Sequence, residues 1–196
     1  MLALCLLTGC GGSAGDPALA GAEASGGAMT ASRLENQAAP LTEEEVLSAY
    51  SRAEEAYGWF DRETLPAGQE SREIDGRVYY PVREPGMETL ADLRAYLRGL
   101  FSEELTEALL SSGGEAPLYR DVGGALYVLP ARRDRDAVRK EGSVRAESVS
   151  ETAWTVEVTV DLLDGPGGQV TGVEYYAFPY ELEEDRWVFT DFRMID

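Results

Sequence analysis

The fold of this chain is decided by one stretch of alternating residues, Trp154-Thr155-Val156-Glu157-Val158-Thr159-Val160-Asp161-Leu162. A period of two predicts a β-strand with one face in the core and the other in solvent. Turn sequences rich in glycine or acidic residues separate it from two further strand patterns, 170–182 and 186–192. The C-terminal part of the chain is therefore predicted to form a long antiparallel meander.

Helical patterns precede these strands. Thr42 and Glu45 form a capping-box sequence ahead of apolar residues at helical spacing, which predicts a helix of four to five turns ending near Gly58. Thr89 and Ser102 are predicted to cap two shorter helices, the second closed by glycines 113–114.

Short hairpins are predicted around 74–80 and 118–129, with turns at 75–76 and 121–124. Helices first and a meander last predict an α+β fold, in which amino-terminal helices pack on one face of a curved antiparallel sheet. Cystatin-like and nuclear-transport-factor-like cones share this pattern, which by itself carries no function.

The first ten residues are typical of an export signal. An apolar run leads into Leu7-Thr8-Gly9-Cys10, which resembles the lipobox of bacterial lipoproteins. We expect 1–9 to be a signal peptide and Cys10 to carry a lipid that anchors the chain to the outer face of the cytoplasmic membrane. No basic residue precedes the run, so the alternative is an apolar amino-terminal stretch without a targeting role.

The rest of the chain divides by composition. Residues 10–40 are dominated by Gly, Ala and Ser without apolar periodicity, which predicts a flexible tether. Residues 41–196 are predicted to form a single α+β domain, and we expect a monomer.

The charge is strongly acidic. The chain has 17 Lys and Arg against 36 Asp and Glu, a net charge of −19, which argues against nucleic acid as a partner. One stretch is an exception and is interpreted as a solvated loop; its basic residues are Arg132, Arg133, Arg135, Arg139, Lys140 and Arg145.

Several kinds of catalytic site are excluded because the sequence lacks the residues that they need. The sequence has no histidine, and its two cysteines both lie in the first ten residues, so Ser-His-Asp triads, Cys-His pairs and His-ligated metals are excluded and no cofactor is expected. Catalysis by carboxylates alone remains the third-ranked class, with Glu174 and Asp191 as its candidates. The favoured expectation is a protein that is not an enzyme.

The folded part resembles the bacterial DL-endopeptidase inhibitor (IseA) family. The resemblance lies in the order of several blocks across the domain, which are 41–45, 49–50, 57–60, 75–82, 89–97, 100–105, 125–128 and 187–192. It implies a secreted inhibitor of NlpC-type cysteine peptidases, the enzymes that cleave peptidoglycan stem peptides, acting by occlusion of the peptidase cleft.

The resemblance also implies where inhibition would occur. The segment that matches the family's inhibitory loop carries arginines in place of a more glycine-rich sequence; its candidate residues are Pro130, Arg132, Arg133, Asp134 and Arg135. Aromatic residues are candidates for a cleft or for strand core, namely Trp59, Phe60, Tyr79, Tyr80 and Tyr127. The alternative is a lipoprotein of the same fold that binds a ligand or the wall without inhibiting an enzyme.

Overall fold

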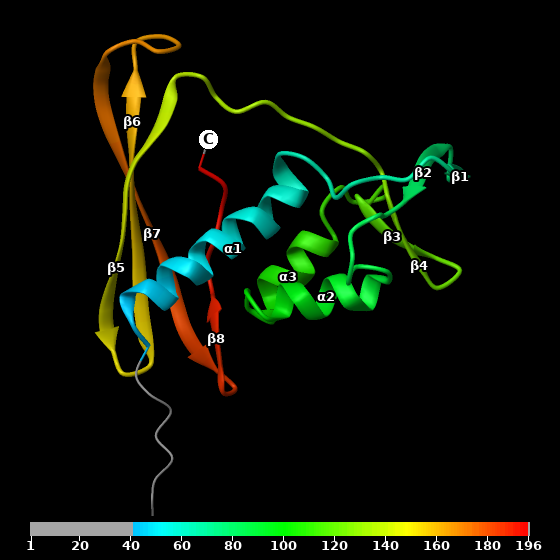
Figure 1. Cartoon of the computed structure of the whole chain (residues 1–196), viewed down its shortest axis with the longest axis horizontal. Helices are drawn as coiled ribbons and strands as arrows, with labels where there is room; N and C mark the ends of the chain where they lie inside the picture. The colour runs from blue at the N-terminus through cyan, green and yellow to red at the C-terminus, as the bar shows by residue number, and fades with distance from the viewer. Residues whose placement is uncertain (1–40, 196) are drawn as a thin grey trace, which may run out of the picture. The chain divides into compact units, whose positions relative to one another are not determined.

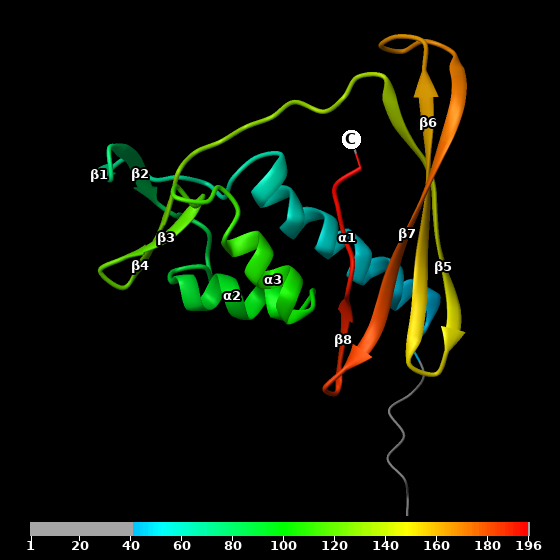
Figure 2. The ribbon, with the colours of Figure 1, turned by 180° about the vertical axis from the view of Figure 1, so that it is seen from behind.

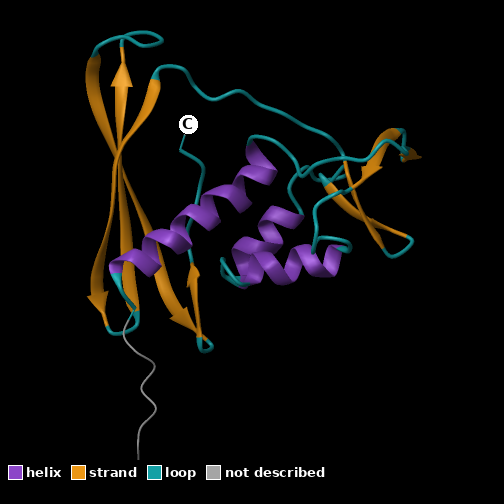
Figure 3. Ribbon diagram, in the orientation of Figure 1, coloured by secondary structure: helices purple, strands orange, loops and turns teal. Residues whose placement is uncertain are grey.

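The computed structural model describes residues 41–195, so the expected signal peptide, Cys10 and the whole tether lie outside the described residues. Within this range the chain is α+β, as predicted, with three helices and two antiparallel sheets (Figures 1 and 3). The elements are α1 (Glu43–Asp61), β1 (Arg72–Ile74), β2 (Arg77–Pro81), α2 (Leu90–Arg98), α3 (Glu103–Leu110), β3 (Tyr119–Val122), β4 (Ala125–Val128), β5 (Arg139–Ser150), β6 (Ala153–Leu163), β7 (Val170–Glu183) and β8 (Arg186–Phe189).

Helix α1 begins where its capping box predicts. The Thr42 backbone N–H donates to the Glu45 carboxylate at 2.8 Å, and the Glu45 N–H donates to the Thr42 hydroxyl at 3.3 Å. The Thr42 N–H and the Thr42 hydroxyl both donate to the Glu45 carboxylate, and these two bonds lower the pKa of Glu45 because they favour its ionised form. The helix continues three residues past Gly58, to Asp61, and buries one face consisting of Val46, Ala49, Tyr50, Ala53 and Ala56.

The predicted meander is the larger sheet, with strand order β5-β6-β7-β8. Val156, Val158 and Val160 of β6 are almost wholly buried, and α1 lies on their side of the sheet (Figure 1). The alternation in the sequence therefore corresponds to a covered inner face and an outer face. The curved sheet with helices on one side is confirmed.

Strand β5 corrects the sequence interpretation. The basic stretch predicted to be a loop is irregular only as far as residue 138, and Arg139, Lys140 and Arg145 lie on β5, which pairs with β6. Most β5 side chains are exposed because β5 is the edge strand, so the apolar alternation that marks a half-buried strand is nearly missing.

The smaller sheet has the order β1-β2-β4-β3 and contains both predicted hairpins. The β1–β2 turn places Asp75 and Gly76 at φ 52° and 72°, the left-handed conformation that a two-residue turn requires. The three helices lie between the two sheets in both views (Figures 1 and 2).

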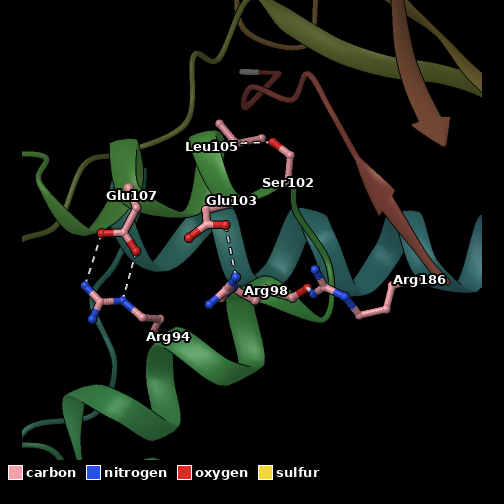
Figure 4. A network of polar contacts seen from close by, with 7 residues as sticks. All are labelled: Arg94, Arg98, Ser102, Glu103, Leu105, Glu107 and Arg186. Carbon is pink, nitrogen blue, oxygen red and sulfur yellow. Dashed lines mark hydrogen bonds and ion pairs between the residues drawn. The ribbon is translucent and has the colours of Figure 1, made fainter. Parts of the chain in front are cut away.

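Helix α2 is bonded both to α3 and to β8 of the larger sheet. Thr89 and Ser102 cap α2 and α3 as predicted, although α3 ends at Leu110, before the glycines expected to close it. Arg94 and Arg98 of α2 form ion pairs with Glu107 and Glu103 of α3, and Arg186 of β8 donates to the Arg98 carbonyl (Figure 4).

Candidate functional site

The connection between β4 and β5 is the most exposed irregular segment near the helices. It runs past the C-terminal end of α1 and links the two sheets (Figures 1 and 2). Every residue from 130 to 137 is exposed. We call 130–137 the connecting segment; it contains the arginine-rich candidate loop.

Hydrogen bonds to a neighbouring segment hold part of the connecting segment, residues 131–133. The Thr64 N–H donates to the Ala131 carbonyl at 3.2 Å, and the Ala131 N–H donates to the Thr64 hydroxyl at 3.3 Å. The Arg133 N–H donates to the Arg62 carbonyl at 2.7 Å, which completes a short antiparallel bridge between 62–64 and 131–133. Residues 131–133 are therefore both exposed and held in place before any partner binds.

The side chains of the arginines contact carboxylates of the chain itself. Arg132 lies 3.6 Å from Glu63, and Arg133 forms an ion pair with Asp61. The Arg132 side chain remains 72% exposed, and such solvated pairs contribute at most about 1 kcal/mol. Arg132 can therefore exchange its partner at little cost when another carboxylate approaches.

Two hollows flank Trp59 beside this segment. The first, of about 340 Å³, is lined by Trp59 and Arg135 together with Ser51, Glu54, Glu55, Gly58, Arg62 and Glu63. The second, of about 530 Å³, shares Trp59, Glu55 and Glu63 with the first and adds Thr64, Leu65, Pro66 and Glu84. The structure thus brings the predicted loop and one predicted cleft residue to the same place.

The other predicted cleft residues are elsewhere. Phe60 packs against Tyr119 with ring centroids 5.0 Å apart. Tyr79 and Tyr127, on β2 and β4, are buried, and the Tyr79 hydroxyl donates to the Pro117 carbonyl at 2.9 Å. Tyr80 is a half-buried residue of β2. For Tyr79 and Tyr127 the strand-core interpretation therefore describes the structure.

The sequence analysis did not identify Tyr119 as a residue of this site, although its hydroxyl bonds to the backbone on both sides of 62–64. Its hydroxyl accepts a hydrogen bond from the Leu65 N–H at 2.9 Å and donates one to the Trp59 carbonyl at 3.0 Å. Burial raises the pKa of this phenol, so it stays protonated and able to donate. One side chain on β3 thereby bonds both to the end of α1 and to Leu65, directly after the segment 62–64 that holds residues 131–133.

The two carboxylates considered for catalysis have unrelated surroundings. Glu174 pairs with Arg139 at 3.0 Å and accepts a hydrogen bond from the Tyr176 hydroxyl. Asp191 is exposed beyond the end of β8. Among residues 41–195, no group of three or more potential metal ligands comes together, and no helix is both long and apolar enough to cross a membrane.

The surroundings of Trp59 combine three features that a binding site can use. They are the hydrogen-bonded, exposed residues 131–133, the solvated Arg132 guanidinium, and an aromatic ring that shares its hollow with carboxylates. No protein-family model and no curated protein matches the chain.

The pKa of Glu141, a residue of β5, is raised, and this predicts a pH dependence of stability. Desolvation raises its pKa and the nearby Glu54 raises it further, while Arg135 and Arg62 act in the opposite direction. The folded chain therefore holds this proton more tightly than the unfolded chain does. Stability contributed by the protonated form is lost as pH rises from the ordinary glutamate pKa, about 4.3, through the raised value.

Glu141→Gln is accordingly expected to increase the free energy of unfolding at pH 7 by up to about 1 kcal/mol, since the side chain keeps contact with solvent. At pH 4 the gain should largely vanish, because the glutamate is then mostly protonated in both states. Urea denaturation at both pH values measures this. Glu147→Gln, an exposed position on the same strand, should show little change, and a destabilised Glu141→Gln variant at pH 7 would contradict the assignment.

Proposed function

We propose that this chain is a lipid-anchored, extracytoplasmic protein inhibitor of cell-wall cysteine peptidases of the NlpC type. The connecting segment enters the peptidase cleft and blocks access of peptidoglycan stem peptides. The observation that supports the proposal best is the exposed run 130–137, in which residues 131–133 are hydrogen-bonded to 62–64 before binding.

An ordered segment favours inhibition for an energetic reason. A flexible loop loses conformational entropy when it enters a cleft, whereas a segment already held by its own chain loses little. The bridge to 62–64 leaves the outward edge of the segment available for a partner. Such a segment can occupy a substrate cleft through main-chain hydrogen bonds, as added strands do elsewhere.

The arginines provide the proposed specificity. Arg132 and Arg133, now paired with Glu63 and Asp61, can exchange these partners for carboxylates in the peptidase cleft. This mechanism needs no nucleophile, metal or cofactor in the inhibitor. Trp59 lies beside the segment, where it can contact the rim of the cleft.

The test is a titration of the full chain against an NlpC-type DL-endopeptidase, with cleavage of a muropeptide as the readout. The double variant Arg132→Glu with Arg133→Glu is expected to raise the inhibition constant at least 100-fold, because carboxylate would face carboxylate. The neutral pair Arg132→Gln with Arg133→Gln, which cannot repel Glu63 and Asp61, should raise it at least tenfold.

The matched control is Arg77→Glu with Arg83→Glu, which changes the same charge at two exposed positions outside the connecting segment. Its inhibition constant should stay within threefold of the original. Equal inhibition by the original chain and by both connecting-segment variants would refute the role of the segment. Absence of inhibition by the original chain would refute the proposed function.

A further inference from the structure

A separate hollow lies on the outer face of the larger sheet, and none of the residues that line it belongs to the connecting segment. Its volume is about 400 Å³, at the small end of the range for ligand sites. The side chains used below come from three adjacent strands and are Ser143, Arg145, Glu157, Thr159, Tyr175 and Ala177. They alternate along β6 and β7 with the buried inner residues Val156, Val158 and Phe178, so the helices do not cover this face.

An irregularity in β5 shapes one wall of the hollow. The pairing of β5 with β6 shifts between Glu141 and Val144, which leaves Gly142 and Ser143 in a bulge. The Ser143 N–H donates to the Thr159 hydroxyl at 2.8 Å, and the two hydroxyl oxygens lie 2.9 Å apart. A Cβ atom at Gly142 would lie 2.8 Å from that Thr159 oxygen, so the hydroxyl pair depends on glycine here. Bulges of this kind often redirect side chains at binding sites.

Cross-strand register places the remaining groups. Thr159 lies opposite Tyr175, and Arg145, Glu157 and Ala177 form the adjacent row. The Tyr175 side chain is 77% exposed, an unusual environment for a large aromatic ring. Ala177 is small, so the floor between the tyrosine and the charged pair stays open.

The chemistry of these groups selects a ligand class. Arg145 and Glu157 neutralise each other through a 2.7 Å hydrogen bond, so the hollow has no uncompensated charge to attract an ion. Hydroxyls, a guanidinium and a carboxylate offer many donors and acceptors around one exposed aromatic face. A neutral ligand with an apolar C–H face and a rim of hydroxyls satisfies both features, and a pyranose ring is such a ligand.

We propose that the outer face of the β5-β6-β7 sheet binds a neutral saccharide, which stacks on Tyr175 while Arg145, Glu157, Ser143 and Thr159 hydrogen-bond its hydroxyls. The site is independent of the proposed peptidase inhibition and lies on different elements. It would give the protein a second attachment, to a glycan.

Titration of the full chain with N-acetylglucosamine tetramer and, separately, with cellotetraose tests the proposal by isothermal calorimetry. Saturable one-site binding of at least one tetrasaccharide is expected, and a comparison of the two separates recognition of the acetamido group from recognition of the ring. Tyr175→Ala should weaken binding at least tenfold. Val173→Ala, an exposed apolar position on the same strand outside the hollow, should leave it within twofold.

Failure to bind either tetrasaccharide overturns the proposal, as does equal binding by the Tyr175→Ala variant. Sedimentation velocity of the same proteins tests whether this face instead binds a second copy of the chain. Self-association that Tyr175→Ala abolishes, without sugar binding, would make the face an interface between copies instead. Tyr175→Ala should keep full activity in the peptidase assay, so failure of one proposal is distinguishable from failure of the other.

Discussion

Phe192→Ala is expected to lower the free energy of unfolding by about 3–5 kcal/mol, the largest effect of any single substitution considered for this chain. Phe192 is 3% exposed and follows the last strand. Its ring centroid lies 4.8–5.6 Å from five other aromatic rings, which are Tyr50, Tyr57, Phe101, Phe178 and Phe189.

The reason for the size of this effect is the position of the ring between elements. Phe192 contacts α1, the segment after α2, β7 and β8, so truncation opens a cavity where four parts of the chain meet. Urea denaturation followed by circular dichroism measures the loss. Phe192→Leu retains most of the volume and should cost less than about 1.5 kcal/mol. A loss below about 1 kcal/mol for Phe192→Ala would show that this packing is wrong.

Tyr119→Phe should have the second-largest effect, a loss of about 2–3 kcal/mol. The substitution removes one oxygen and leaves two backbone groups, the Leu65 N–H and the Trp59 carbonyl, without their partner. The ring remains, so its packing on Phe60 is unchanged and the loss reports the hydrogen bonds. Denaturation measures the loss, and hydrogen exchange at the Leu65 amide should accelerate.

The same variant connects stability to the proposed function. If Tyr119 positions residues 62–64, its loss should also loosen the connecting segment and weaken peptidase inhibition several-fold. Tyr175→Phe removes a phenol hydroxyl from an exposed ring and should leave both stability and inhibition unchanged. A Tyr119→Phe variant as stable as the original chain would contradict the hydrogen-bond assignment.

The parts of the fold that were predictable are those with a local cause. The Thr42 and Thr89 capping boxes each depend on residues three positions apart, and the Asp75-Gly76 turn depends on two neighbours. The alternation on β6 is also local, because burial on one face imposes a period of two along the strand. These patterns identified three helices, two hairpins and the meander.

The parts that were not predictable depend on distant partners. Strand β5 has charged and small residues on both faces, so only its pairing with β6 makes it a strand. Tyr79 and Trp59 are aromatic residues in similar local patterns, yet Tyr79 is buried and Trp59 lines two hollows. Sequence spacing cannot separate these outcomes, because burial depends on which segments pack over a residue.

The sequence by itself determined the α+β class, the helix starts, the acidic charge and the absence of histidine. Each of these follows from composition or from residues close together in the chain. Only the tertiary structure decided that 131–133 lies against 62–64 and that Tyr119 bonds to Trp59 and Leu65 on either side of 62–64. It also placed Ser143 and Tyr175 around one hollow. The hydrogen bonds in these regions join residues that are 16 to 71 positions apart, and folding alone brings such residues within bonding distance.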